Sequence, residues 1–244
     1  MAPKADRAVT DHVAPWRRTI RYHLVRALVW TVLRAYVRPR LEGREDLPQG
    51  PYLLCFNHLN WVDPFVIVAL WPGRPRLYFF GPREEEMGVG ARNRLIGWLG
   101  TAVPFKPGKN DLLTSTRRAV AVLDDGNVLG IAAEGQLGED ENSVLPLNEG
   151  AAYFALRAGV PLVPVAVNGT RWLRFGKPIR VRVGQPIAAA GRRASHASVD
   201  ELTAEAHRQL SSLVRDYPDQ RIPGPFGRWL TDVFSERPWR DQAR

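Results

Sequence analysis

Residues 52–64 read YLLCFNHLNWVDP, and the expected fold rests on this stretch. The apolar run 52–56 has the length and composition of a buried strand. Pro64 opens a second apolar run that predicts a helix, because proline favours the first helical position. A short polar turn joins the two runs. The stretch therefore predicts a strand–turn–helix unit.

Strands and helices alternate along the rest of the chain in the same way. Alternation of this kind is typical of an α/β fold, in which functional residues gather where strands end and loops begin. We therefore predict a mostly parallel sheet flanked by helices. The expected strands are 52–56, 76–80, 128–133, 160–170 and 179–183, and the expected helices are 64–70, 111–124, 151–158 and 198–214.

The turn contains a histidine and an aspartate five positions apart, His58 and Asp63. A histidine can accept a proton at neutral pH, and a carboxylate on its other ring nitrogen fixes the tautomer and stabilises the imidazolium. The chain has no Gly-x-Ser-x-Gly motif, so the hydroxyl to be activated can belong to the substrate. Asp63 before Pro64 is also an ordinary helix N-cap, and this second interpretation is compatible with the first.

Cys55 is the single cysteine of the chain. It excludes an intramolecular disulfide and any site with several cysteine ligands. Its position three residues before His58 allows a Cys–His nucleophile pair, but its apolar strand favours a buried, unreactive thiol. The five histidines do not fall at ligand spacing, so no metal is expected.

The formal net charge is +9, and most of it lies near the start of the chain. Residues 1–40 contain nine Lys or Arg and two Asp, a balance of +7. Residues 1–12 predict a disordered leader, and residues 13–40 predict a basic amphipathic helix. Its apolar runs are too short to span a bilayer, so the helix either lies in a membrane interface or docks on its own domain with its arginines in water. No basic–aromatic nucleic-acid module is recognisable.

The segment Asn57-His58-Leu59-Asn60-Trp61-Val62-Asp63 resembles the first motif of the glycerolipid acyltransferases. Three further blocks follow in the order of that family: Gly100–Lys106, the loop from Glu134 to Gly138, and the apolar strand 160–170. The resemblance covers roughly residues 41–187. It implies an acyltransferase domain, which we place at 41–216, followed by a Pro- and Trp-containing tail at 217–244 that packs on the domain or touches lipid.

The resemblance assigns roles to individual residues. His58 is implied to be the general base and Asp63 its orienting partner. Asn57 and Gly135 are expected at the substrate, where Gly135 permits either close backbone approach or a positive φ. Glu134 is expected to hydrogen-bond an acceptor hydroxyl or to brace its loop. The cations expected to bind anionic substrate groups are Lys106, Arg92 and Arg94.

The third block departs from the family pattern, because Gln136-Leu137 stands where a Thr-Arg pair is usual. The missing arginine normally helps to bind the acceptor phosphate, so the reaction class is better supported than the acceptor. We expect an O-acyltransferase that moves a fatty acyl group from acyl-CoA or acyl carrier protein to a lysophospholipid, most simply lysophosphatidic acid. It would need no cofactor and would work at the cytoplasmic face of an anionic membrane. The alternative is a non-catalytic lipid-binding protein on the same scaffold.

Overall fold

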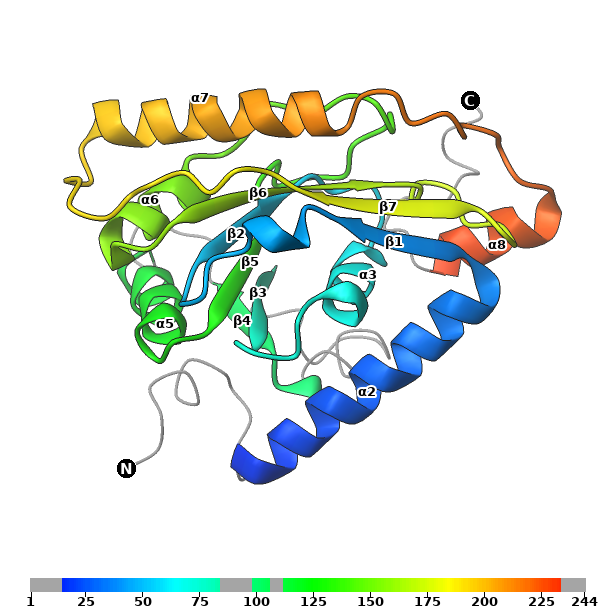
Figure 1. Ribbon diagram of the computed structural model, residues 1–244, viewed down its shortest axis with the longest axis horizontal. Coiled ribbons are helices and arrows are strands. Elements are labelled where there is room, and N and C mark those ends of the chain that lie inside the picture. Colours follow the sequence, from blue (N-terminus) through cyan, green and yellow to red (C-terminus); the bar gives the residue numbers. More distant parts are fainter. Residues whose placement is uncertain (1–14, 84–97, 106–111, 234–244) are drawn as a thin grey trace.

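The computed structural model describes residues 15–83, 98–105 and 112–233, and the expected leader 1–12 lies outside these ranges. A seven-stranded sheet forms the centre of the molecule (Figure 1), in the order β1-β7-β6-β2-β5-β3-β4. The strands are β1 (Arg38–Glu42), β2 (Leu53–Phe56), β3 (Leu77–Arg83), β4 (Ala102–Phe105), β5 (Val128–Ala132), β6 (Leu162–Asn168) and β7 (Pro178–Val183).

The sheet is mostly parallel, which confirms the predicted fold class. β2 lies between β5 and β6 and is parallel to both, so the turn after Phe56 opens where neighbouring strands also end. β6 and β7 pair antiparallel, because the short connection between them contains no crossover helix.

β1 is a difference from the sequence expectation, which placed residues 13–40 in a helix and began the domain at residue 41. The strand begins at Arg38 and pairs in parallel with β7. It forms one edge of the sheet. A proline has no N–H to donate to a neighbouring strand, and an edge strand such as β1 tolerates Pro39 because its outer side has no neighbour. Pairing with a distant strand thus overrides the local helical pattern.

Helices cover both faces of the sheet, because strand side chains alternate in direction. Leu53 and Cys55 point into the core beneath one set of helices, and Leu54 and Phe56 into the core beneath the other. The first set, on what we call the α7 face, comprises α5 (Leu112–Asp124), α6 (Gly150–Ala158) and α7 (His196–Leu213). The second, on the α2 face, comprises α2 (Pro15–Tyr36), α3 (Asp63–Leu70) and α8 (Pro225–Val233).

α7 begins earlier than its sequence pattern suggested. We expected the helix to open at Ser198, but its N-cap is Ser195, whose Oγ accepts a hydrogen bond from the Ser198 backbone N–H at 3.3 Å. Either serine could cap a helix, and the structure uses the one that adds a further turn.

α2 is docked on the protein partly through arginines. Arg26 donates to the carbonyl oxygens of Val68 and Trp71 at 3.2 and 2.6 Å, at the end of α3. Arg18 is buried, together with Tyr22 and Val25. The alternative of a docked helix expected its arginines in water, but Arg18 and Arg26 turn towards the protein.

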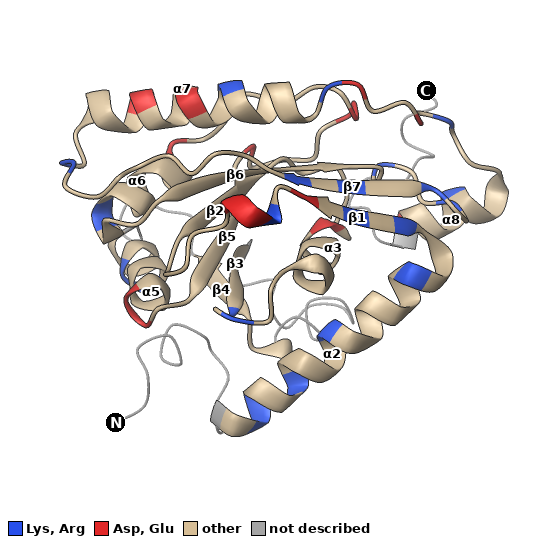
Figure 2. Cartoon of the chain, in the orientation of Figure 1, with Lys and Arg blue, Asp and Glu red and all other residues tan. Residues whose placement is uncertain are grey.

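The outer side of α2 is apolar. Five apolar side chains, spaced four residues apart, and Trp30 are 46–63% exposed. Apolar side chains therefore lie on both the inner and the outer side of α2. This pattern is normal for a helix that is covered on both sides. Figure 2 shows basic residues along α2, whereas acidic residues appear on α7. No helix within the described ranges is both long and apolar enough to cross a bilayer. We call the five side chains the α2 row: Trp16, Ile20, Leu24, Leu28 and Val32.

Candidate active site

His58 and Asp63 face each other in the turn after β2. The Nδ1 atom of His58 lies 2.8 Å from Oδ2 of Asp63, and the two side chains are 18% and 0% exposed. The buried carboxylate thus fixes the ring through Nδ1. This arrangement leaves Nε2 as the nitrogen that can exchange a proton with a substrate.

Asp63 does not cap α3, so that interpretation of the sequence was wrong. Val62 is the N-cap residue and makes no side-chain cap bond. The Asp63 carboxylate instead turns back to the loop, where Oδ2 also accepts hydrogen bonds from the backbone N–H groups of Leu59 and Asn60 at 2.7 and 2.9 Å. One carboxylate oxygen therefore shapes the loop and orients the imidazole.

Glu134 braces the same loop from the end of β5. Its Oε2 accepts from the His58 backbone N–H and its Oε1 from that of Leu145, both at 2.7 Å. Burial raises the pKa of the Glu134 carboxyl, and these two N–H groups oppose the rise. Of the two roles expected for Glu134, the structure shows the bracing contacts. Gly138 adds a second tie, because its backbone N–H donates to the His58 carbonyl oxygen at 2.6 Å.

The two other residues expected at the substrate, Gly135 and Asn57, have clear structural roles in the described loops. Gly135 has a φ of +68°, which favours glycine, and a Cβ there would lie 2.3 Å from Nδ2 of Asn148 and would require that side chain to move. Asn57 is fully buried, and its amide group both donates to and accepts from the backbone of Val167 at 2.9 and 2.7 Å. Asn57 thus ties the loop to β6, and direct contact of either residue with substrate stays a prediction.

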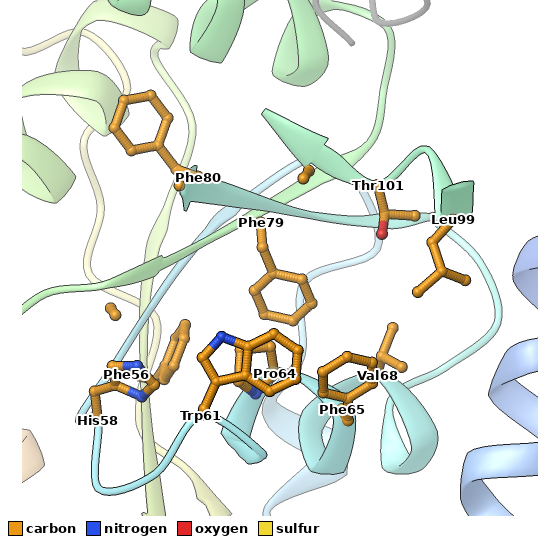
Figure 3. Close-up of a pocket in the computed structure, with 13 residues that line it drawn as sticks. Phe56, His58, Trp61, Pro64, Phe65, Val68, Phe79, Phe80, Leu99 and Thr101 are labelled. Carbon is orange, nitrogen blue, oxygen red and sulfur yellow. The ribbon is translucent and has the colours of Figure 1, made fainter. Parts of the chain in front are cut away.

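An apolar pocket opens beside the imidazole. Figure 3 shows His58 towards one end and Val68 and Leu99 towards the other. The pocket volume of about 190 Å³ exceeds the roughly 150 Å³ of an apolar cavity that takes up benzene, so hydrocarbon can enter. Apolar side chains of β2, the turn after it, α3, β3 and the segment before β4 line most of it, among them Phe56, Trp61, Phe65, Phe79 and Leu99.

Cys55 takes no part in this site. It is fully buried and belongs to the core of the α7 face, whereas its neighbour Phe56 belongs to the core of the α2 face and lines the pocket. Burial raises the pKa of its thiol to about 12. A Cys–His nucleophile pair is therefore incompatible with the fold.

The expected cations Lys106, Arg92 and Arg94 lie outside the described residues, and their contact with anionic substrate groups stays a prediction. In the part of the chain that is described, no group of three or more His, Cys, Asp or Glu side chains is placed to hold a metal ion.

The sequence did not reveal how the loops are held together. Leu145, Gly138 and Val167 contribute through backbone atoms, which leave no trace in side-chain identity. Gly138 is the one residue whose type could have indicated a close contact between these loops. A Cβ there would lie 3.4 Å from a methyl of Leu59 and 3.5 Å from the His58 carbonyl oxygen.

Comparison with known proteins identifies the family. The model of a family described as "Acyltransferase" matches residues 38–168, which is more than half of the chain. The chain belongs to this acyltransferase family. The matched region contains the His58–Asp63 pair, the Glu134 brace and β6.

Two relatives agree with this acyltransferase assignment. The 1-acyl-sn-glycerol-3-phosphate acyltransferase of Saccharomyces cerevisiae is 24% identical over 226 residues, which cover 84% of this chain. The chain spans 65% of the length of that relative. The crystal structure of the 1-acyl-sn-glycerophosphate (LPA) acyltransferase PlsC from Thermotoga maritima superimposes with a TM-score of 0.63 at 18% identity, covering 88% of this chain and 87% of the other, and so shares the fold. The resemblance to the glycerolipid acyltransferases is thus confirmed.

Proposed function

We propose that this acyltransferase-family protein is an O-acyltransferase that moves a fatty acyl group from a thioester to a hydroxyl of a lysophospholipid. The observation that carries the proposal is the His58–Asp63 pair, 2.8 Å apart, beside an apolar pocket. A base that faces hydrocarbon suits a reaction between a hydroxyl and a fatty acyl thioester.

The chemistry needs one proton carrier. As the acceptor hydroxyl oxygen attacks the thioester carbonyl carbon, Nε2 of His58 takes the hydroxyl proton and the Asp63 carboxylate stabilises the imidazolium. The tetrahedral intermediate then collapses, the carbon–sulfur bond breaks, and the imidazolium returns the proton to the leaving sulfur. The products are an ester and a free thiol, and His58 is neutral again.

The pocket supports a place for the acyl chain. Its lining continues from His58 to Val68 and Leu99. An acyl chain whose carbonyl carbon lies near His58 would therefore be surrounded by apolar side chains. α2 passes beside this far end, since Arg26 donates to the Val68 carbonyl oxygen and Arg21 to the Trp98 carbonyl oxygen at 3.3 Å. The acyl chain would therefore point towards α2.

The α2 row supports peripheral attachment to a membrane. Tryptophan and branched aliphatic side chains beside arginines suit the boundary between headgroups and acyl chains. Arg17 and Arg34 are exposed on the same helix and would meet anionic headgroups. We place the protein at the cytoplasmic face, where acyl-CoA and acyl carrier protein occur.

Lysophosphatidic acid is our proposed acceptor, because both named relatives act on it according to their descriptions. Gln136-Leu137 supplies no cation for its phosphate, so Lys106, with Arg92 or Arg94, is proposed to do so. Lysine would act there as a point charge, without the bidentate fork of arginine.

The test is release of thiol from acyl-CoA in the presence of a panel of lysophospholipids. His58→Ala should abolish this release, whereas its circular-dichroism spectrum and melting temperature should stay near those of the wild type. An active His58→Ala variant would refute the base assignment. Turnover with a lysophospholipid other than lysophosphatidic acid would correct the acceptor alone.

The non-catalytic alternative predicts a different result from the same panel. The altered third block is the observation that favours it, and the intact His58–Asp63 pair argues against it. Binding of lysolipids to the wild-type protein without any thiol release across the panel would support the alternative over the enzyme.

A further inference from the structure

A group of large apolar side chains is exposed near the end of the described chain. Phe226 and Trp229 of α8 are 65% and 59% exposed, and Ile222, just before the helix, is 61% exposed. Phe175, in the connection between β6 and β7, is 68% exposed. The rings of Phe226 and Trp229 are in contact, with centroids 5.7 Å apart. We call these four residues the α8 patch.

The packing of α8 does not use this patch. The helix is held from its other side by Thr231, which is buried and accepts a hydrogen bond from the Leu173 backbone N–H at 2.9 Å. Gly227 lies against the same segment, because a Cβ there would be 2.8 Å from the Leu173 carbonyl oxygen. Phe226 and Trp229 therefore point away from a helix surface that is already fixed. Groups of large exposed apolar side chains commonly mark interaction sites on soluble proteins.

The α8 patch continues the surface of α2. The Phe175 ring packs edge-on against Tyr36 at the end of α2, with centroids 6.0 Å apart. Gly176 donates its backbone N–H to the Tyr36 carbonyl oxygen at 2.8 Å, so this connection is fastened to α2 on one side and to α8 on the other. Figure 1 shows α8 beside the turn that leads from α2 into β1. Both helices pack on the α2 face of the sheet.

The chemistry of the combined surface suits a lipid interface. Tryptophan and phenylalanine favour the headgroup boundary of bilayers. Arg34 and Arg38, which lie two residues either side of Tyr36, are exposed, as is Arg221, which precedes Ile222 and pairs with Asp219. The sequence from residue 15 to residue 41 contains no Asp or Glu, so no carboxylate of α2 would repel anionic lipid. Exposed aromatic side chains together with exposed arginines match the anionic headgroup boundary of a membrane, which is the occupant we assign to the patch.

We propose that the α8 patch is a second membrane contact, which enters the same lipid interface as the α2 row and fixes the orientation of the protein on it. One helix on a surface can roll about its axis, whereas contacts at α2 and at α8 define a plane. The inference rests on the proposed membrane contact of α2, and its test separates the two.

The test uses a fluorophore attached to an introduced thiol. Cys55 is the single cysteine and is fully buried, so an environment-sensitive label reacts at the new site. Three variants are compared with vesicles of phosphatidylglycerol and phosphatidylcholine: Phe226→Cys in the α8 patch, Leu24→Cys in the α2 row, and Ala204→Cys on the exposed side of α7. We expect the vesicles to raise the emission of the first two labels and to shift it to shorter wavelength. In vesicles whose lipids are brominated in the acyl chains, this emission should be quenched. The label on α7 should not respond.

The outcomes separate the hypotheses. A response from the α2 label without one from the α8 label would overturn this inference and leave the proposed attachment through α2 intact. No response from either label would overturn both. A change of the α8 label with protein concentration in the absence of vesicles, matched by dimers in analytical ultracentrifugation, would identify a second copy of the chain as the occupant and overturn the lipid assignment.

A second measurement asks whether the patch contributes to binding. The Phe226→Ser and Trp229→Ser double variant should lose at least about tenfold in vesicle affinity, because two large apolar side chains no longer leave water. Its melting temperature and its turnover of a short-chain, water-soluble acyl-CoA with a soluble acceptor should match the wild type, since neither residue lies in the active site. Wild-type vesicle affinity in a folded double variant would overturn the proposal.

Discussion

The two longest helices, α2 and α7, lie on opposite faces of one sheet and have opposite surfaces. α7 buries Leu202 and Leu210 and leaves charged side chains such as Arg208 in water. α2 draws Arg18 inward and leaves the α2 row outside. α7 has the pattern of a helix between a core and water. The contrast supports the proposal that the outer side of α2 meets lipid and not water. The pocket and His58 open on the face of the sheet that α2 covers.

The largest expected effect is chemical and concerns the α2 face. Asp63→Asn keeps the size of the side chain but removes the charge that stabilises the imidazolium, so turnover should fall by about 10³-fold or more. Steady-state thiol release from acyl-CoA measures the loss. A variant with more than a tenth of wild-type turnover would show that Asp63 orients the loop and not the base.

The second effect concerns the outer surfaces of the two helices. The double variant Leu24→Glu and Leu28→Glu should lower vesicle affinity at least about tenfold, because it places charge where apolar side chains would enter lipid. The matched change Ala204→Glu on α7 should leave affinity unchanged. Vesicle sedimentation compares the two. Equal losses in both variants would indicate general charge repulsion and would remove the distinction between the faces.

The third effect compares arginines on the two helices. Arg26→Ala removes two hydrogen bonds from a charged group to the end of α3 and should lower the free energy of unfolding by about 2 kcal/mol. Arg208 forms an exposed ion pair with Glu205 one turn away, so Arg208→Ala should cost less than about 0.5 kcal/mol. Urea unfolding of both variants gives the difference. Similar values would mean that Arg26 contributes no more than a surface charge.

The smallest effect is expected at Cys55, which belongs to the core of the α7 face. Burial holds the pKa of its thiol at about 12, so at pH 8 the group stays protonated and covered. Iodoacetamide should leave the folded enzyme unmodified and fully active, and mass spectrometry should detect alkylation after unfolding in guanidinium. Inactivation of the folded enzyme at the rate of Cys55 modification would restore a role for the thiol.

The sequence predicted those parts of the fold that depend on near neighbours in the chain. β2, the following turn and α3 form one local unit, and the pattern of apolar and polar residues in that stretch was sufficient to predict it. β1 could not be predicted in this way, because residues 38–42 become a strand by pairing with residues 178–182 of β7. α8 was also missed, since its short pattern stands among prolines and its position depends on the distant backbone of Leu173.

The candidate site shows the same division. His58 and Asp63 could be paired from the sequence because they are only five positions apart and a turn of four residues joins them. The contact of Glu134 with the His58 backbone N–H joins residues 76 positions apart. It could not be predicted from the sequence, because every residue except proline has a backbone N–H. The motif suggested Glu134 as a substrate or bracing residue, and the hydrogen bonds required coordinates.

The hydrogen bonds of Arg26 to the last turn of α3 have a geometric consequence. α3 has eight residues, so it is a rod about 12 Å long with the Asp63 carboxylate at its first residue and the anchor of α2 near its last. If α2 rests in the headgroup layer, the imidazole is held at a set height relative to that layer. A lysolipid would then need to leave the bilayer by only part of its own length to bring its hydroxyl to the imidazole. Its tail would remain among the other lipids.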